Sequence, residues 1–162
     1  MKMKVNTEKY LARYAMVSDL EDIKIAYGRM LMFLDEQNFD ILPTSDNVDW
    51  VGDHIFEPAI IDGRSEILIV ENEEREKVSY LFWVRDPEVI ESRYKKATSY
   101  GQWVDPEFRG NGLVSMMVSI ARDNMQRIGV ERVLDMVHIN DVAEAIKDSG
   151  FKIDQKVVIL EV

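Results

Sequence analysis

The chain has 162 residues, 46% of them hydrophobic, which suits one compact domain and excludes two large ones. It contains no cysteine, so thiol nucleophiles, thiolate zinc sites and iron–sulfur clusters are excluded. The formal net charge is −10, and the acidic excess is spread along the whole chain. A nucleic-acid ligand is not expected because no basic stripe is present.

The first 14 residues contain lysines but no apolar core and no small-residue cleavage site, so no secretory signal is predicted. No window reaches the roughly 18 apolar residues that a membrane-spanning helix needs. These patterns predict a cytoplasmic protein with no membrane partner.

The N-terminal third predicts a strand and then two helices. Residues 12–17 favour a short strand, and Ser18 with Glu21 predicts a capping box at the start of a helix. Apolar residues then recur at spacings of three and four, which indicates one buried helix face ending near Asn38. These are Leu20, Ile23, Tyr27, Met30, Leu31 and Leu34. A weaker helix is predicted over residues 46–56.

The middle of the chain predicts an antiparallel hairpin. Two extended apolar runs, residues 66–70 and 78–84, flank the acidic segment 71–76. We interpret the acidic segment as a solvated turn rather than a substrate-attracting surface. Residues 86–95 are predicted to form a loop or a short helix.

The rest of the chain predicts three more strands and two helices without a domain boundary. A strand over 97–104 leads through an irregular loop, 105–112, into a helix that Gly129 terminates. The apolar face of that helix, interpreted as core, consists of Leu113, Met116, Met117, Ile120, Ala121, Met125 and Ile128. A strand over 131–137, a helix over 141–150 and strands over 151–154 and 156–162 complete an α/β pattern of mixed sheet and helices.

The loop before the long helix carries the chemical information. Glycines allow backbone N–H groups to point to one place, and a helix N-terminus adds positive potential, so the loop predicts an anion cradle. A guanidinium there could bind phosphate through two parallel hydrogen bonds. The residues are Arg109, Gly110, Asn111 and Gly112. The spacing matches neither a Walker loop nor a dinucleotide fingerprint, and a simple tight turn is the alternative.

The ten residues 103–112, WVDPEFRGNG, resemble the cofactor-binding segment of the GNAT acetyltransferases. Asn140 and the downstream pair Gly150 and Phe151 resemble a second segment of that family, and the element order agrees from about residue 12 to the end. The resemblance implies a single domain over residues 1–162. It implies a mostly antiparallel mixed sheet with helices on both faces, whose fourth and fifth strands splay apart.

The same resemblance implies an acetyl-CoA-dependent N-acetyltransferase acting on an amine of a small molecule or protein. Backbone groups of Gln102, Trp103 and Val104 would bind the pantetheine arm, and the N–H near Gln102 would stabilise the oxyanion. The amides from Arg109 to Leu113 would bind the pyrophosphate, and Asn140 joins the cofactor-binding residues. No metal is implied, and a homodimer is possible.

Three positions depart from the family pattern. Val114 stands where a small residue is usual and could crowd the cofactor, while Ile146 replaces the usual tyrosine acid. Thr98 occupies the position of a glutamate base. The alternative function is therefore a catalytically degenerate domain that binds coenzyme A or a protein partner without turnover.

Substitutes for the missing acid and base are predicted from strand alternation. Tyr100 is expected on the same face as Thr98 and Gln102, where its hydroxyl could approach the thioester sulfur, with a packed aromatic as the alternative. Trp103 is expected on the opposite face, in the core.

The remaining candidates lie elsewhere in the chain. His138 could accept the amine's proton, or it is a bystander at a strand end. Asp135 could attract a cationic amine, or it belongs to a structural pair, and His54 could border the acceptor pocket. A water relay to an acid on an acceptor-side loop is the simplest alternative.

Overall fold

A computed structural model describes residues 7–37, 43–87 and 95–134. The predictions for His138, Asn140, Asp135 and Ile146, and for the elements after residue 134, lie outside this range. No helix within the described ranges is long and apolar enough to cross a membrane.

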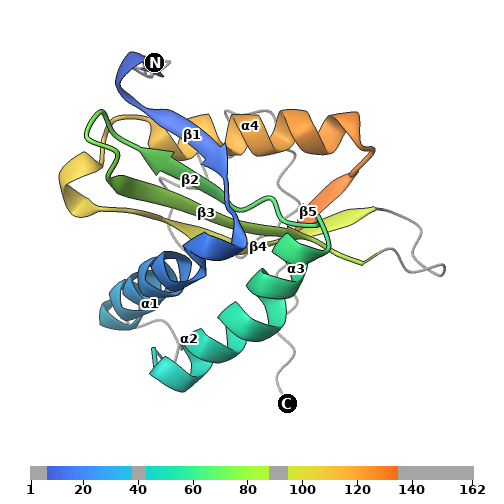
Figure 1. The fold of residues 1–162 in the computed structure, drawn as a ribbon, viewed down its shortest axis with the longest axis horizontal. Helices are drawn as coiled ribbons and strands as arrows, with labels where there is room; N and C mark the ends of the chain where they lie inside the picture. Colours follow the sequence, from blue (N-terminus) through green and yellow to red (C-terminus); the bar gives the residue numbers. More distant parts are fainter. Residues whose placement is uncertain (1–6, 38–42, 88–94, 135–162) are drawn as a thin grey trace.

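The described residues form a central five-stranded sheet in the order β1-β2-β3-β4-β5 (Figure 1). The strands are β1 (Leu11–Tyr14), β2 (Leu68–Glu71), β3 (Lys77–Arg85), β4 (Lys96–Val104) and β5 (Arg132–Leu134). The first four strands pair antiparallel, and β5 pairs parallel to β4.

Within the described residues, helices cover both faces of the sheet (Figure 1). They are α1 (Leu20–Glu36), α2 (Ser45–Val51), α3 (Glu57–Ile61) and, on the opposite face, α4 (Leu113–Arg127). The predicted fold class, a mostly antiparallel mixed sheet between helical layers, is confirmed.

Helix α1 buries the predicted apolar stripe against the sheet, although its start differs from the prediction. Residues Val17–Asp19 form a 3-10 turn, and the helix follows at Leu20. The capping role of Ser18 is wrong: the Asp19 carboxylate, not the serine, accepts a hydrogen bond from the Met16 N–H at 2.8 Å. Charge pairing of Asp19 with Arg13 fixes this turn more strongly than a serine cap could.

The second predicted helix is longer than expected and is interrupted by a π-helical turn. This turn, η3 (Gly52–Phe56), joins α2 directly to α3. A Cβ atom at Gly52 would lie 2.5 Å from Cε and 2.8 Å from Cγ of Lys24, so a larger residue there would require the Lys24 side chain to shift. Lys24 also pairs with Asp53 at 2.7 Å, which ties η3 to α1.

The hairpin of β2 and β3 is confirmed, and its acidic segment forms a solvated turn as interpreted. The Asn72 side-chain oxygen accepts hydrogen bonds from the N–H groups of Glu74 and Glu76, at 3.0 and 2.9 Å. The asparagine, rather than the carboxylates, organises the turn.

On the other face, α4 buries most of its predicted stripe under β2, β3 and β4. Leu113, Met117, Ala121 and Met125 are buried there, whereas Ile128 is exposed. Gly129 has a φ of +81°, which confirms the predicted left-handed position after the helix.

Candidate functional site

Strand β4 continues along one edge beyond the described part of β5. The described part of β5 pairs only with Lys96–Thr98, the first three residues of β4. From Ser99 to Val104, no described strand pairs with this edge. Backbone N–H and C=O groups on a free strand edge can bind an extended ligand chain.

A β-bulge lies at the point where this free edge begins. Leu81 is opposite Gln102, but Trp83 is opposite Ser99, so β4 contains one residue more than β3. Gly101 adopts a φ of +105° there, and an added Cβ would lie 2.6 Å from Sδ of Met30. The glycine therefore permits both the bulge and the contact with α1.

The bulge corrects two predictions about side-chain direction. Gln102 pairs with Leu81, which packs under α4, so Gln102 lies on the α4 face and not on the face of Tyr100. Tyr100 and Trp103 both pack on the α1 face, so the prediction that they point in opposite directions is wrong. Simple alternation fails here because the inserted residue moves each following side chain of β4 to the opposite face of the sheet. Trp103 is buried in the core, as predicted.

The loop after β4 presents a row of backbone N–H groups. Gly110 and Gly112 have φ values of +82° and +74°, and the N–H of Met116 makes the first bond of α4, to the Gly112 carbonyl. No described residue accepts a hydrogen bond from the backbone N–H groups of residues 110–115. The predicted irregularity of the loop is only partly right, because Pro106–Phe108 forms a 3-10 turn.

Arg109 contacts aromatic rings instead of extending freely from the loop. Its Cζ lies 5.0 Å from the centre of the Trp103 ring and 5.2 Å from that of Phe33. Its Nε donates to the Val104 carbonyl at 3.1 Å. The terminal Nη1 and Nη2 have no hydrogen-bond partner among the described residues, so one end of the guanidinium is left for an anion.

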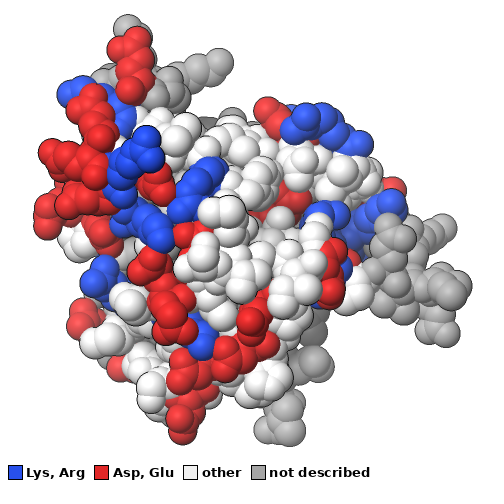
Figure 2. Space-filling model, viewed as in Figure 1, with Lys and Arg blue, Asp and Glu red and all other residues white. Residues whose placement is uncertain are grey.

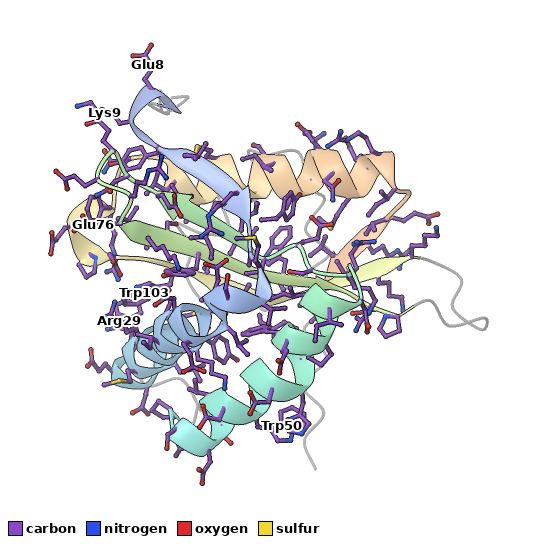
Figure 3. All side chains as sticks on the ribbon, in the orientation of Figure 1. Glu8, Lys9, Arg29, Trp50, Glu76 and Trp103 are labelled. Carbon is purple, nitrogen blue, oxygen red and sulfur yellow. The ribbon has the colours of Figure 1, made fainter. Side chains whose placement is uncertain are left out.

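Asp105 anchors the start of the same loop to α1. It accepts a hydrogen bond from Nε1 of Trp103 at 2.8 Å and lies 3.5 Å from Nη1 of Arg29. Figure 3 shows Trp103 and Arg29 together between α1 and the end of β4. Val114 is partly buried against the α4-face core, and its branched side chain therefore has a packing role in addition to any effect on a ligand.

The carboxylate of Asp86, which the sequence alone did not indicate, lies beside Thr98, the residue at the position of the family's glutamate base. Thr98 donates a hydrogen bond from Oγ1 to Oδ1 of Asp86 at 2.8 Å. Asp86 follows directly after β3, and its N–H bonds to the Lys96 carbonyl at 2.9 Å. Only the cross-strand register, Val84 opposite Thr98, reveals this proximity, and that register is not visible in a single segment.

Tyr100 lies on the same face as Thr98, against an aromatic cluster. Its ring meets Phe56 edge-on at 5.7 Å, and Phe56 meets Tyr27 edge-on at 5.2 Å. Burial raises the pKa of Tyr100, and the nearby Asp86 charge raises it further. The hydroxyl therefore keeps its proton at neutral pH and could donate it.

His54 does not join these residues. It is exposed, stacks on Trp50 at 5.0 Å, and its Nδ1 lies 2.9 Å from the Trp50 carbonyl. Trp50 points away from the sheet in Figure 3. His54 has no contact with β4 among the described residues that would support the prediction that it borders the acceptor pocket.

No protein-family model and no curated protein matches the sequence. Solved structures match the fold across nearly the whole chain. A GCN5-related N-acetyltransferase from Ralstonia eutropha JMP134 has a TM-score of 0.67 at 15% identity, covering 91% of this chain and 95% of its own. A predicted acetyltransferase with acetyl-CoA from Clostridium acetobutylicum has a TM-score of 0.69 at 15% identity, covering 94% and 96%. The chain has the GNAT fold.

The GNAT fold is not restricted to proteins described as acetyltransferases. A transcriptional regulator from Bacillus halodurans C-125 has a TM-score of 0.68 at 19% identity, covering 94% of this chain and 99% of its own. The similarity confirms the GNAT resemblance drawn from residues 103–112 at the level of the fold.

Proposed function

We propose that this protein is an acetyl-CoA-dependent N-acetyltransferase. One observation carries the proposal: the edge of bulged β4 that no described strand pairs with leads directly into the loop before α4, whose N–H groups have no acceptor among the described residues. An extended, amide-containing arm that ends in a pyrophosphate fits this combination of edge and cradle.

Coenzyme A fits the groups present. Its pyrophosphate would accept hydrogen bonds from the N–H groups of residues 110–113, at the positive end of the α4 dipole. The free edge over Gln102–Val104 would bind the pantetheine amides, and the terminal nitrogens of Arg109 would add positive charge. The role of Asn140 stays a prediction.

When bound, acetyl-CoA supplies an acetyl group activated as a thioester. Transfer to an amine forms a C–N bond and breaks the C–S bond, so a proton must leave the amine and another must reach the departing sulfur. Tyr100, which keeps its proton at neutral pH, is the proposed donor. His138 stays the proposed acceptor of the amine's proton.

The acceptor in this proposal is an amine of a small molecule or a protein. Acidic side chains gather over the helices α2 and α3 (Figure 2). Asp46, Asp49 and Asp53 are exposed there. Such a surface favours the approach of a cationic acceptor over that of an anionic one.

Isothermal titration with acetyl-CoA, followed by a thiol-release assay across a panel of amines, tests the proposal. We expect binding in the wild type, and a loss of roughly 1.5–3 kcal/mol in Arg109→Ala. Arg122→Ala, on α4, is the matched control and should bind as the wild type does. Binding without thiol release by any amine would favour the degenerate domain, and absence of binding would refute the proposal.

A further inference from the structure

The Asp86 carboxylate has a charge that no described cation neutralises. Its Oδ1 accepts the Thr98 hydroxyl, which is neutral, and Oδ2 has no hydrogen-bond or ion-pair partner among the described residues. The residue is partly buried at the end of β3. A partly buried carboxylate is less well hydrated than an exposed one, so a cation that binds to it stabilises its charge.

The surroundings of Asp86 suit an organic cation. Thr98 and Tyr100 follow one another along the α1 face of β4, and the Asp86 charge acts on the Tyr100 hydroxyl. Tyr100 is only partly buried, so its ring stays accessible. A carboxylate next to an aromatic ring is a typical arrangement for binding an alkylammonium group.

We propose that Asp86 binds the ammonium group of the acceptor, and that Thr98 is a positioning residue that directs Oδ2 toward it. This inference rests on the proposed function and specifies its acceptor as a cationic amine. The hydrogen bond from Thr98 fixes one carboxylate oxygen, so the other keeps a constant place in relation to Tyr100. In this proposal Asp86 binds and orients the ammonium group of the acceptor. A different group accepts the proton that the amine loses.

Binding of simple amines provides a test that needs no turnover. The probes are butylamine, 2-phenylethylamine and spermidine, with butanol and 2-phenylethanol as neutral partners, titrated into 15N-labelled protein at pH 7. We expect the wild type to bind at least one amine about tenfold or more tightly than its alcohol. Asp86→Asn should lose this preference, whereas Asp35→Asn, an exposed aspartate of α1, should keep it. Equal binding of amines and alcohols by the wild type would overturn the inference, as would an unchanged preference in Asp86→Asn.

Variants of Thr98 separate positioning from simple packing. Thr98→Ser keeps the hydroxyl and should retain the preference for amines, while Thr98→Val keeps the shape and should lower it severalfold. An equal effect of the two variants would contradict the positioning role. Circular dichroism and thermal melting of each variant identify any that fail to fold.

Acetyl-CoA titrations on the same samples distinguish this inference from the proposed function. Acetyl-CoA should bind Asp86→Asn as tightly as the wild type, and the KM for the amine should rise at least tenfold. A normal KM in an active Asp86→Asn enzyme would overturn the role of Asp86 and leave the transferase intact. An amine preference without any acetyl-CoA binding would refute the transferase and leave the ammonium site in place.

Discussion

The guanidinium of Arg109 stacks on the ring of Trp103, with 5.0 Å between Cζ and the ring centre. Phe33 of α1 contacts the same guanidinium at 5.2 Å, so the charged residue of the loop is held by β4 and α1 together. The orientation of the Arg109 guanidinium therefore depends on α1, a helix far from the loop in sequence.

We expect Phe33→Leu to weaken acetyl-CoA binding even though Phe33 carries no charge. Loss of one cation–π contact at an exposed site is worth about 0.5–1 kcal/mol, which corresponds to roughly a two- to fivefold higher Kd. Isothermal titration measures it, with Met32→Leu, an exposed neighbour on α1, as the control. Unchanged affinity in Phe33→Leu would show that Trp103 and the bond to Val104 orient Arg109 without Phe33.

The local patterns of the sequence predicted the elements that surround the site. The three-and-four spacing in α1 and α4 and the hairpin depend on residues close together in the chain, and these elements are confirmed. The face of the sheet on which Gln102 lies, and the contact of Asp86 with Thr98, both depend on the register of β3 against β4. A single segment does not contain that register.

One local signal for the bulge was present in the sequence. Gly101 interrupts a run of strand-forming residues, and an isolated glycine in a strand often marks a bulge. A bulge at Gly101 places Tyr100 and Trp103 on the same face of the sheet.

Gly101→Ala should destabilise the protein more than Gly63→Ala does. Both glycines have positive φ, +105° and +70°, but only Gly101 faces an obstacle, Sδ of Met30 at 2.6 Å from an added Cβ. Backbone strain of this kind costs about 1–3 kcal/mol, and the clash adds to it. Urea denaturation gives both values, and similar losses in the two variants would mean that Met30 moves aside freely.

Asp19→Asn should lower the free energy of unfolding at pH 7 by about 3 kcal/mol or more, because it breaks a buried charge network. Asp19 is buried and pairs with Arg13 at 2.8 Å and Lys77 at 2.9 Å. Asp35→Asn, on the exposed side of α1, should change stability little.

The same network predicts how stability depends on pH. Hydrogen bonds from Arg13, Lys77 and the Met16 N–H hold the pKa of Asp19 well below its usual value, although burial opposes them. Because the folded pKa is lower than the unfolded one, the contribution of Asp19 is complete above about pH 4 and is lost as the pH falls further. Urea denaturation between pH 6 and pH 2 should show a smaller acid-induced loss in Asp19→Asn than in the wild type. Parallel curves would mean that other carboxylates control acid unfolding.

Tyr100→Phe should lower kcat at least tenfold and leave the Kd for acetyl-CoA unchanged, because it removes a proton donor and keeps the ring. Burial raises the pKa of Tyr100, so the alkaline limb due to its ionisation should lie above pH 10 and should disappear in the variant. Tyr80→Phe is the matched control: Tyr80 lies on the same face of the sheet, and burial raises its pKa to about 12. Equal kcat values for the wild type and both variants would leave Tyr100 as a packed aromatic residue, with the proton reaching the sulfur from water.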